Sequence, residues 1–85
     1  PPLGVLMRWT EAEFLRHTEG SAIRRIGHER WQRNIAVAMG NALRQADLTK
    51  TQAQDIRSAL VDVRPDASVL VQAHIDWALA VPTQL

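Results

Sequence analysis

Apolar and polar residues recur with a helical period over residues 28–46, the longest periodic segment of the chain. At about 100° per residue, one broad arc of the helical wheel collects Trp31, Ile35, Ala38, Met39, Ala42 and Leu43. The opposite arc collects Arg30, Arg33, Asn34, Asn41 and Arg44. The pattern therefore predicts an amphipathic helix with an apolar core face and a polar face rich in arginine and asparagine.

Short helices and turns are expected before this segment. Thr10 and Glu13 have the T-x-x-E spacing of a capping box, in which each side chain caps the other residue's backbone N–H. In the helix that follows, Phe14 and Leu15 are expected to face the core. Ser21 is placed to cap a further brief turn before the central helix begins.

A second long helix is expected after the polar connection that follows residue 46. Thr49 or Thr51 can cap it, because threonine is a favourable residue at a helix start. Its apolar positions recur at helical spacing and comprise Ala53, Ile56, Leu60 and Val63. The run Arg64-Pro65-Asp66 is expected to end it, since a residue before proline avoids the helical conformation.

A last helix is expected beyond that turn, capped by Asp66 or Ser68. Its end is expected at Pro82, because proline cannot continue the backbone hydrogen bonding of a helix. Its expected inward-facing residues are Leu70, Ala73, Trp77 and Val81.

No segment shows the strict alternation and β-branched enrichment of a strand, so the sequence predicts an all-α fold. One helical domain is expected over residues 1–85, with short helices and turns over 1–27, a central helix over 28–46 and a helical hairpin over 51–81. Two antiparallel helices stacked on an earlier one suggest a small α-solenoid fragment. A compact irregular bundle is the alternative.

The chain has no cysteine, which excludes disulfides, thiolate zinc sites and cysteine-ligated iron–sulfur clusters within it. Its histidines lack the H-E-x-x-H arrangement, and no nucleophile elbow, phosphate-cradling loop or dinucleotide-binding glycine pattern occurs. We therefore expect no catalytic, cofactor-binding or metal-binding residue here. Every apolar run is far shorter than the roughly 20 residues of a membrane helix, and a cytoplasmic location is expected.

Basic residues concentrate in the first half of the chain. Residues 1–44 hold seven Arg and four Glu, a net charge of +3, whereas residues 45–85 hold three basic and five acidic groups, a net charge of −2. We name as the arginine cluster the candidate nucleic-acid-binding residues Arg24, Arg25, Arg30, Arg33 and Asn34. Guanidinium forks suit bidentate contacts to phosphate. The alternative is a solvated face, partly neutralised by Glu19 and Glu29.

Three motifs over residues 21–41 together form a specific sequence pattern: S-A-I-R-R-x-G, then R-W-x-R-N, then A-x-G-N. The earlier run L-x-x-L-M-R-W-T-E-A-E-F and the later H-I-D-W-A-L fit the same pattern. Together these motifs resemble the C-terminal tail of bacterial epoxyqueuosine reductases, whose last part is a HEAT-like helical repeat. Gln72 departs from the arginine common at its position in such repeats.

The resemblance implies a parent enzyme, an oxidoreductase that reduces epoxyqueuosine to queuosine at the tRNA wobble position with cobalamin and two 4Fe-4S clusters. It places the catalytic domains before Pro1, outside this chain. The present chain is then expected to be a structural and tRNA-docking module that also contacts the N-terminal catalytic domain of the same protein. A helical protein-interaction module without nucleic-acid binding is the alternative; helix-turn-helix DNA binding is disfavoured by the acidic second half.

Overall fold

The computed structural model describes residues 2–81, which are entirely helical apart from turns and connections. This result confirms the predicted all-α class. The elements, in chain order, are α1 (Leu3–Arg8), α2 (Glu11–His17), the 3-10 helix η1 (Ala22–Ile26), α3 (Gly27–Leu43), α4 (Lys50–Val63), the 3-10 helix η2 (Arg64–Asp66) and α5 (Val69–Leu79).

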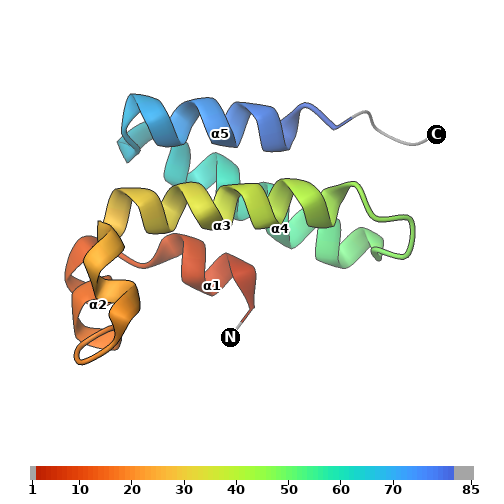
Figure 1. Ribbon diagram of the computed structural model, residues 1–85. Coiled ribbons are helices and arrows are strands. Elements are labelled where there is room, and N and C mark those ends of the chain that lie inside the picture. Colours follow the sequence, from red (N-terminus) through yellow and green to blue (C-terminus); the bar gives the residue numbers. More distant parts are fainter. Residues whose placement is uncertain (1, 82–85) are drawn as a thin grey trace.

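Helix α3 is the centre of the arrangement (Figure 1). It makes its most extensive contact with α5, while α1 packs against both α3 and α4. Helices α4 and α5 run in opposite directions and are joined at η2, as expected for the hairpin (Figure 1). These helices pack as one five-helix domain, and no repeated unit is evident in the described part of the chain. The shared core consists of Met7, Ile35, Ala36, Met39, Leu43, Ile56, Ala59, Leu60, Val71, Ile75 and Ala78.

Local capping signals set the helix starts. The Thr10 hydroxyl accepts from the backbone N–H of Glu13 at 3.2 Å, and the Glu13 carboxylate accepts from the backbone N–H of Thr10 at 3.0 Å. Thr49 and Gln52 form the same reciprocal pair at the start of α4, and the Ser68 hydroxyl caps α5. The predicted capping box at Thr10 is confirmed, and Thr49 rather than Thr51 caps α4.

The central helix is slightly displaced from its expected range. It begins at Gly27, whose φ of +81° is accessible to glycine at little cost and turns the chain out of η1. Ser21 caps η1, as expected, through its hydroxyl and the backbone N–H of Ile23. The helix ends at Leu43, three residues before the expected end at residue 46.

The expected inward face of the last helix is wrong for three of its four residues, while Val81 is partly buried against the core as expected. Leu70 and Trp77 are 40% and 41% exposed, and Ala73 is also exposed. The buried residues are instead Val71, Ile75 and Ala78, each 0% exposed. Helix α5 is apolar around most of its circumference, so its sequence offers several candidate core faces, and packing against α3 selects one of them. The expected stop at Pro82 lies outside the described residues.

Smaller corrections apply to two other helices. Ala38 on α3 and Leu15 on α2 were expected to face the core but are exposed. Ala36 and Gly40 are buried instead, because α5 lies closely along the side of α3 that carries these small residues. A close approach of two helices needs small residues at the contact, which a search for large apolar side chains does not find.

Trp77 and Arg44 close the contact between α3 and α5. The indole of Trp77 lies directly over Gly40, where a Cβ atom would collide with the ring. The guanidinium carbon of Arg44 is 4.1 Å from the centroid of the Trp77 ring, a cation–π geometry. Arg44 also donates to the carbonyl oxygen of Gly40 at 2.7 Å and to that of Trp77 at 3.1 Å. The Arg44 side chain, at the end of α3, thereby makes two contacts with Trp77 of α5 and one with Gly40 of α3.

Aromatic rings hold the α1–α2 corner against the start of α3. Trp9 stacks with Trp31 at a centroid distance of 5.5 Å, and the buried ring of Phe14 contacts both Trp31 and His28. His28 donates through Nε2 to the carbonyl oxygen of Trp9 at 2.7 Å, and Trp31 donates through Nε1 to that of Leu6 at 3.3 Å. One ring nitrogen of His28 and the indole nitrogen of Trp31 are therefore used in fixing the corner.

Replacing Gly40 with alanine tests the contact between α3 and α5. The added methyl group would overlap the indole of Trp77, which is held in place by Arg44. We expect Gly40→Ala to lower the free energy of unfolding by about 1–3 kcal/mol, the usual cost of overpacking, in chemical denaturation experiments.

The matched control is Gly4→Ala in α1. There the new methyl group would lie 3.4 Å from the flexible end of Arg8 and 3.7 Å from Ala59, which is ordinary or nearly ordinary contact. Because alanine also favours helix, stability should stay the same or rise slightly. Equal losses of stability in the two variants would contradict the proposed role of Gly40.

Acid should destabilise the fold through Glu13 and Asp76. Hydrogen bonds with Thr10 lower the pKa of Glu13 from its ordinary 4.5, and the hydrogen bond and charge of Arg64 lower the pKa of Asp76 from its ordinary 3.8. Stabilisation by a carboxylate with a lowered folded-state pKa is complete above the ordinary value and is lost as the pH falls through the folded value.

We therefore expect the melting temperature to decline below about pH 4, the range in which carboxylates protonate. The double variant Glu13→Gln with Asp76→Asn should show a shallower decline, because neither substituted side chain titrates. Thermal unfolding followed by circular dichroism between neutral and acidic pH measures both curves. A decline of the same steepness in the two proteins would exclude these groups as its source.

Candidate nucleic-acid interface

Two members of the arginine cluster, Arg24 and Arg25, lie in η1 between α2 and α3. Both residues are exposed. Together with Gly20, Ser21 and Ala22 they line a shallow hollow of about 470 Å³. Because Ser21 caps η1 and a positive-φ glycine ends it, the backbone that carries the two arginines has a defined turn geometry. The hollow therefore presents two guanidinium groups on a structured support.

The other members, Arg30, Arg33 and Asn34, lie near the start of α3. Arg30 and Asn34 are exposed, and Arg33 is half-buried. Arg33 donates from Nε and Nη2 to Oδ1 of Asn34, at 3.4 and 3.2 Å. Within residues 2–81 no hydrogen bond links this group to Arg24 or Arg25. The arginine cluster thus forms two groups that follow one another along η1 and α3.

No arginine of the cluster forms an ion pair within residues 2–81. The ion pairs of that part of the chain join Arg8 to Asp62 at 2.8 Å and Arg64 to Asp76 at 2.7 Å. The glutamates close to the cluster in sequence are exposed and do not pair with it. Since no carboxylate within residues 2–81 pairs with them, the guanidinium groups of the cluster are available to bind an anionic ligand.

Arg44 has a different role, although the helical wheel places it on the same polar arc as Arg30 and Arg33. Its guanidinium stacks on Trp77 and donates to the carbonyl oxygens of Gly40 and Trp77, so the group is held in the contact between α3 and α5. The polar face of α3 is therefore divided into an arginine group available for ligands at its start and a structural arginine at its end.

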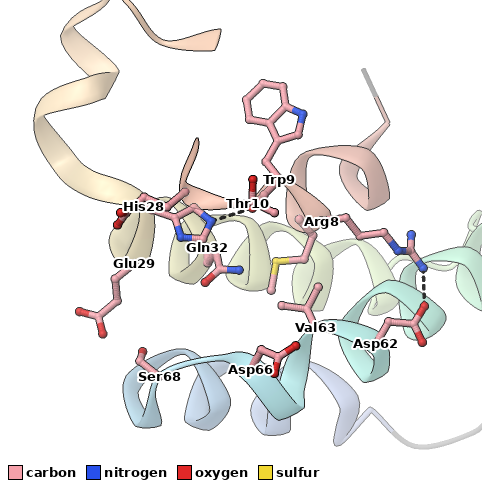
Figure 2. A pocket seen from close by; sticks show the side chains of 12 residues that line it. Arg8, Trp9, Thr10, His28, Glu29, Gln32, Asp62, Val63, Asp66 and Ser68 are labelled. Atoms are coloured by element: carbon pink, nitrogen blue, oxygen red, sulfur yellow. Dashed lines mark hydrogen bonds and ion pairs between the residues drawn. The ribbon is translucent and has the colours of Figure 1, made fainter. Parts of the chain in front are cut away.

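A polar hollow of about 540 Å³ opens between the α1–α2 corner, α3 and the segment around η2 (Figure 2). Four carboxylates line it, together with one arginine that is already paired; these residues are Arg8, Glu11, Glu29, Asp62 and Asp66. This hollow has no signal in the sequence, because its residues come from segments far apart in the chain. Its excess of negative charge repels phosphate, so this side of the domain does not suit a nucleic acid.

The described residues lack the ligands that an iron–sulfur cluster needs. Within residues 2–81 no three His, Asp or Glu side chains gather as metal ligands, and the sequence has no cysteine. Iron–sulfur clusters need thiolate ligands, which these residues therefore cannot supply. Among the described helices, none has both the length and the apolar character needed to cross a membrane.

Comparison with curated proteins identifies close relatives. The chain is 59% identical over 78 residues to an epoxyqueuosine reductase of Alicycliphilus denitrificans, which covers 92% of this chain and 21% of the relative. It is 56% identical over 80 residues to the epoxyqueuosine reductase of Shewanella oneidensis, covering 94% of this chain and 19% of that protein. The Escherichia coli enzyme is 49% identical over 80 residues, with the same two coverages.

No protein-family model and no solved structure matches the chain. The chain spans about a fifth of the length of the curated relatives that it matches. Identity of this degree over nearly all of its residues establishes common descent with that part of the relatives. The chain is therefore homologous to one region of epoxyqueuosine reductases.

Proposed function

We propose that this domain is the tRNA-docking and structural tail of an epoxyqueuosine reductase. The observation that carries the proposal is the arginine cluster, whose four guanidinium groups are without ion pairs within residues 2–81 and are presented by η1 and the start of α3. Phosphate neutralisation by arginine supplies most of the sequence-independent affinity for nucleic acids. Because the substrate of a tRNA-modifying parent enzyme is an RNA, the proposed ligand of this surface is an RNA backbone.

Arginine and asparagine suit a structured RNA in particular. A-form stems are recognised mainly through shape, phosphate and 2′-hydroxyl contacts rather than through base edges in a deep major groove. Arg33 donates to the amide oxygen of Asn34, so the exposed amide nitrogen of Asn34 would be the group that donates to an RNA acceptor. Docking of this kind positions a substrate without reading its sequence.

The acidic hollow supports a definite orientation of the RNA. Its carboxylates, including Glu29 and Asp66, would repel a backbone phosphate. Helix α3 carries Glu29 and Gln32 on the side that lines this hollow, and each directly precedes an arginine of the cluster in the sequence. We infer that the RNA passes over η1 and the polar start of α3 and leaves the side facing η2 uncovered.

The chemistry of the parent lies outside these residues in this proposal. Cobalamin and two 4Fe-4S clusters would supply the reducing power for converting epoxyqueuosine to queuosine at the tRNA wobble position, in a cytoplasmic enzyme. This domain would bind and orient the RNA. Its α3, α4 and α5, with an antiparallel pair beside a longer helix, would serve as a HEAT-like unit.

Removing two guanidinium groups tests the proposal. We expect the 85-residue chain to bind an anticodon stem-loop with an affinity that falls as salt rises. The double variant Arg24→Ala with Arg25→Ala should reduce the slope of log K against log salt by about 1.5, since each lost phosphate contact removes roughly 0.7–0.9. Fluorescence anisotropy at several salt concentrations measures the slope.

The control is Lys50→Ala with Arg64→Ala, which removes the same charge from the α4 and η2 side of the domain. Its slope should stay close to that of the unmodified chain. Equal slopes in all three proteins, or binding that is insensitive to salt, would refute direct phosphate contact by the cluster. Circular dichroism of each variant confirms that the helical fold is retained.

A protein-interaction role is the second candidate, and the exposed face of α5 favours it. Val69 is 84% exposed and Leu70 is 40% exposed, next to a small hollow lined by Val37, Ala73, His74 and Trp77. Apolar side chains grouped on one exposed surface are typical of contacts with another protein or domain. The catalytic part of the parent is the proposed partner.

Charged substitution on α5 tests this second role. We expect Val69→Asp with Leu70→Asp to leave the melting temperature nearly unchanged, since both residues are exposed, and to prevent co-elution with the separately produced remainder of an epoxyqueuosine reductase. Val61→Asp is the control, because Val61 is 57% exposed on α4. Docking through α5 would be contradicted if only the Val61→Asp control lost co-elution, or if neither that control nor the double variant lost it.

A further inference from the structure

Three aromatic rings at one end of the domain stack in series. The ring of Trp9 lies 5.5 Å from that of Trp31 with an interplanar angle of 10°, and 4.4 Å from that of His17 with an angle of 5°. Trp31 belongs to α3 and is half-buried, whereas His17 is the last residue of α2. The series therefore runs from the interior of the domain to its surface.

His17 is the surface member of this series. The residue is exposed even though Trp9 covers one face of its imidazole. Within residues 2–81 no other aromatic ring stacks on it, and no hydrogen bond uses its ring nitrogens. A packed tryptophan thus supports the ring from one side, and the residue as a whole is exposed, so that a planar partner can reach it from solvent.

The surroundings of His17 include the first group of the arginine cluster. The turn after His17 leads directly into the hollow that Arg24 and Arg25 line, and α2 and η1 lie at the same end of the molecule (Figure 1). Two acidic residues lie near His17 in the sequence. Glu13 lies one helical turn before it and is engaged with the backbone N–H of Thr10, and Glu19 lies two residues after it and is exposed. A flat open ring and two guanidinium groups therefore share one end of the domain.

We propose that His17 is a stacking platform for an unpaired nucleobase of the RNA whose backbone the arginine cluster holds. The inference rests on the proposed tRNA-docking function and adds a contact to it. Aromatic side chains accept bases of any sequence because every base offers a π face. Because Trp9 already fixes the imidazole, little side-chain freedom is lost when a base stacks on it.

Two RNAs and two variants test the platform. One RNA is a hairpin whose loop contains 2-aminopurine in place of an unpaired base, and the other is a blunt duplex with the same stem sequence. We expect His17→Ala to weaken hairpin binding about 10-fold, within the range for one stacked base, without changing duplex binding. His17→Phe, which keeps a flat ring, should bind both RNAs within about 2-fold of the original. Stacking should also quench 2-aminopurine fluorescence in the original and Phe proteins but not in the Ala protein.

The outcomes separate this inference from the proposed function. Equal weakening of hairpin and duplex by His17→Ala, no effect of that substitution, or identical behaviour of the Ala and Phe variants would overturn stacking while leaving phosphate docking intact. Failure of the original chain to bind either RNA would overturn both. Melting curves of the variants establish that any loss of binding occurs in a folded domain.

Discussion

The close approach of α5 to α3 over Gly40 is the constraint on which the rest of the structure depends. A glycine at that position lets the Trp77 ring lie against the helix backbone. Arg44 then stacks on the ring and donates hydrogen bonds to the backbone carbonyl oxygens of Gly40 and Trp77. This contact buries Ala36 and Ile75 between the helices. It also determines which side of α3 faces inward, so it determines which side remains for a ligand.

The division of α3 into a packed side and an open side links stability to the proposed function. Trp31 anchors the start of the helix through the α1–α2 corner, while Arg30 at the preceding position remains exposed. Arg44, at the other end, is used for packing. On α3 itself, the positive charge that is not used in packing is thus confined to the start of the helix, next to η1. The acidic hollow between the α1–α2 corner, α3 and η2 repels phosphate, so we expect an anionic ligand to bind on the surface formed by η1 and the start of α3.

Local signals made much of the fold predictable from sequence. The Thr10–Glu13 capping box and the Arg64–Asp66 turn depend on neighbouring residues, so they could be read directly. The buried face of α5 could not, because that helix is apolar around most of its surface and only its neighbour selects a face. The arginine cluster was predictable because its members are close in sequence. The acidic hollow was not, since it is assembled from distant segments.

Mapping the RNA-contacting surface residue by residue tests the central claim most directly. In a titration of the isotopically labelled chain with an anticodon stem-loop, backbone amide shifts report which elements contact the RNA. Our account predicts the largest shifts over η1 and the start of α3, including Arg24, Arg25 and Arg30, with little change around Asp62 and Asp66. Shifts confined to the acidic hollow, or to the exposed face of α5, would contradict it.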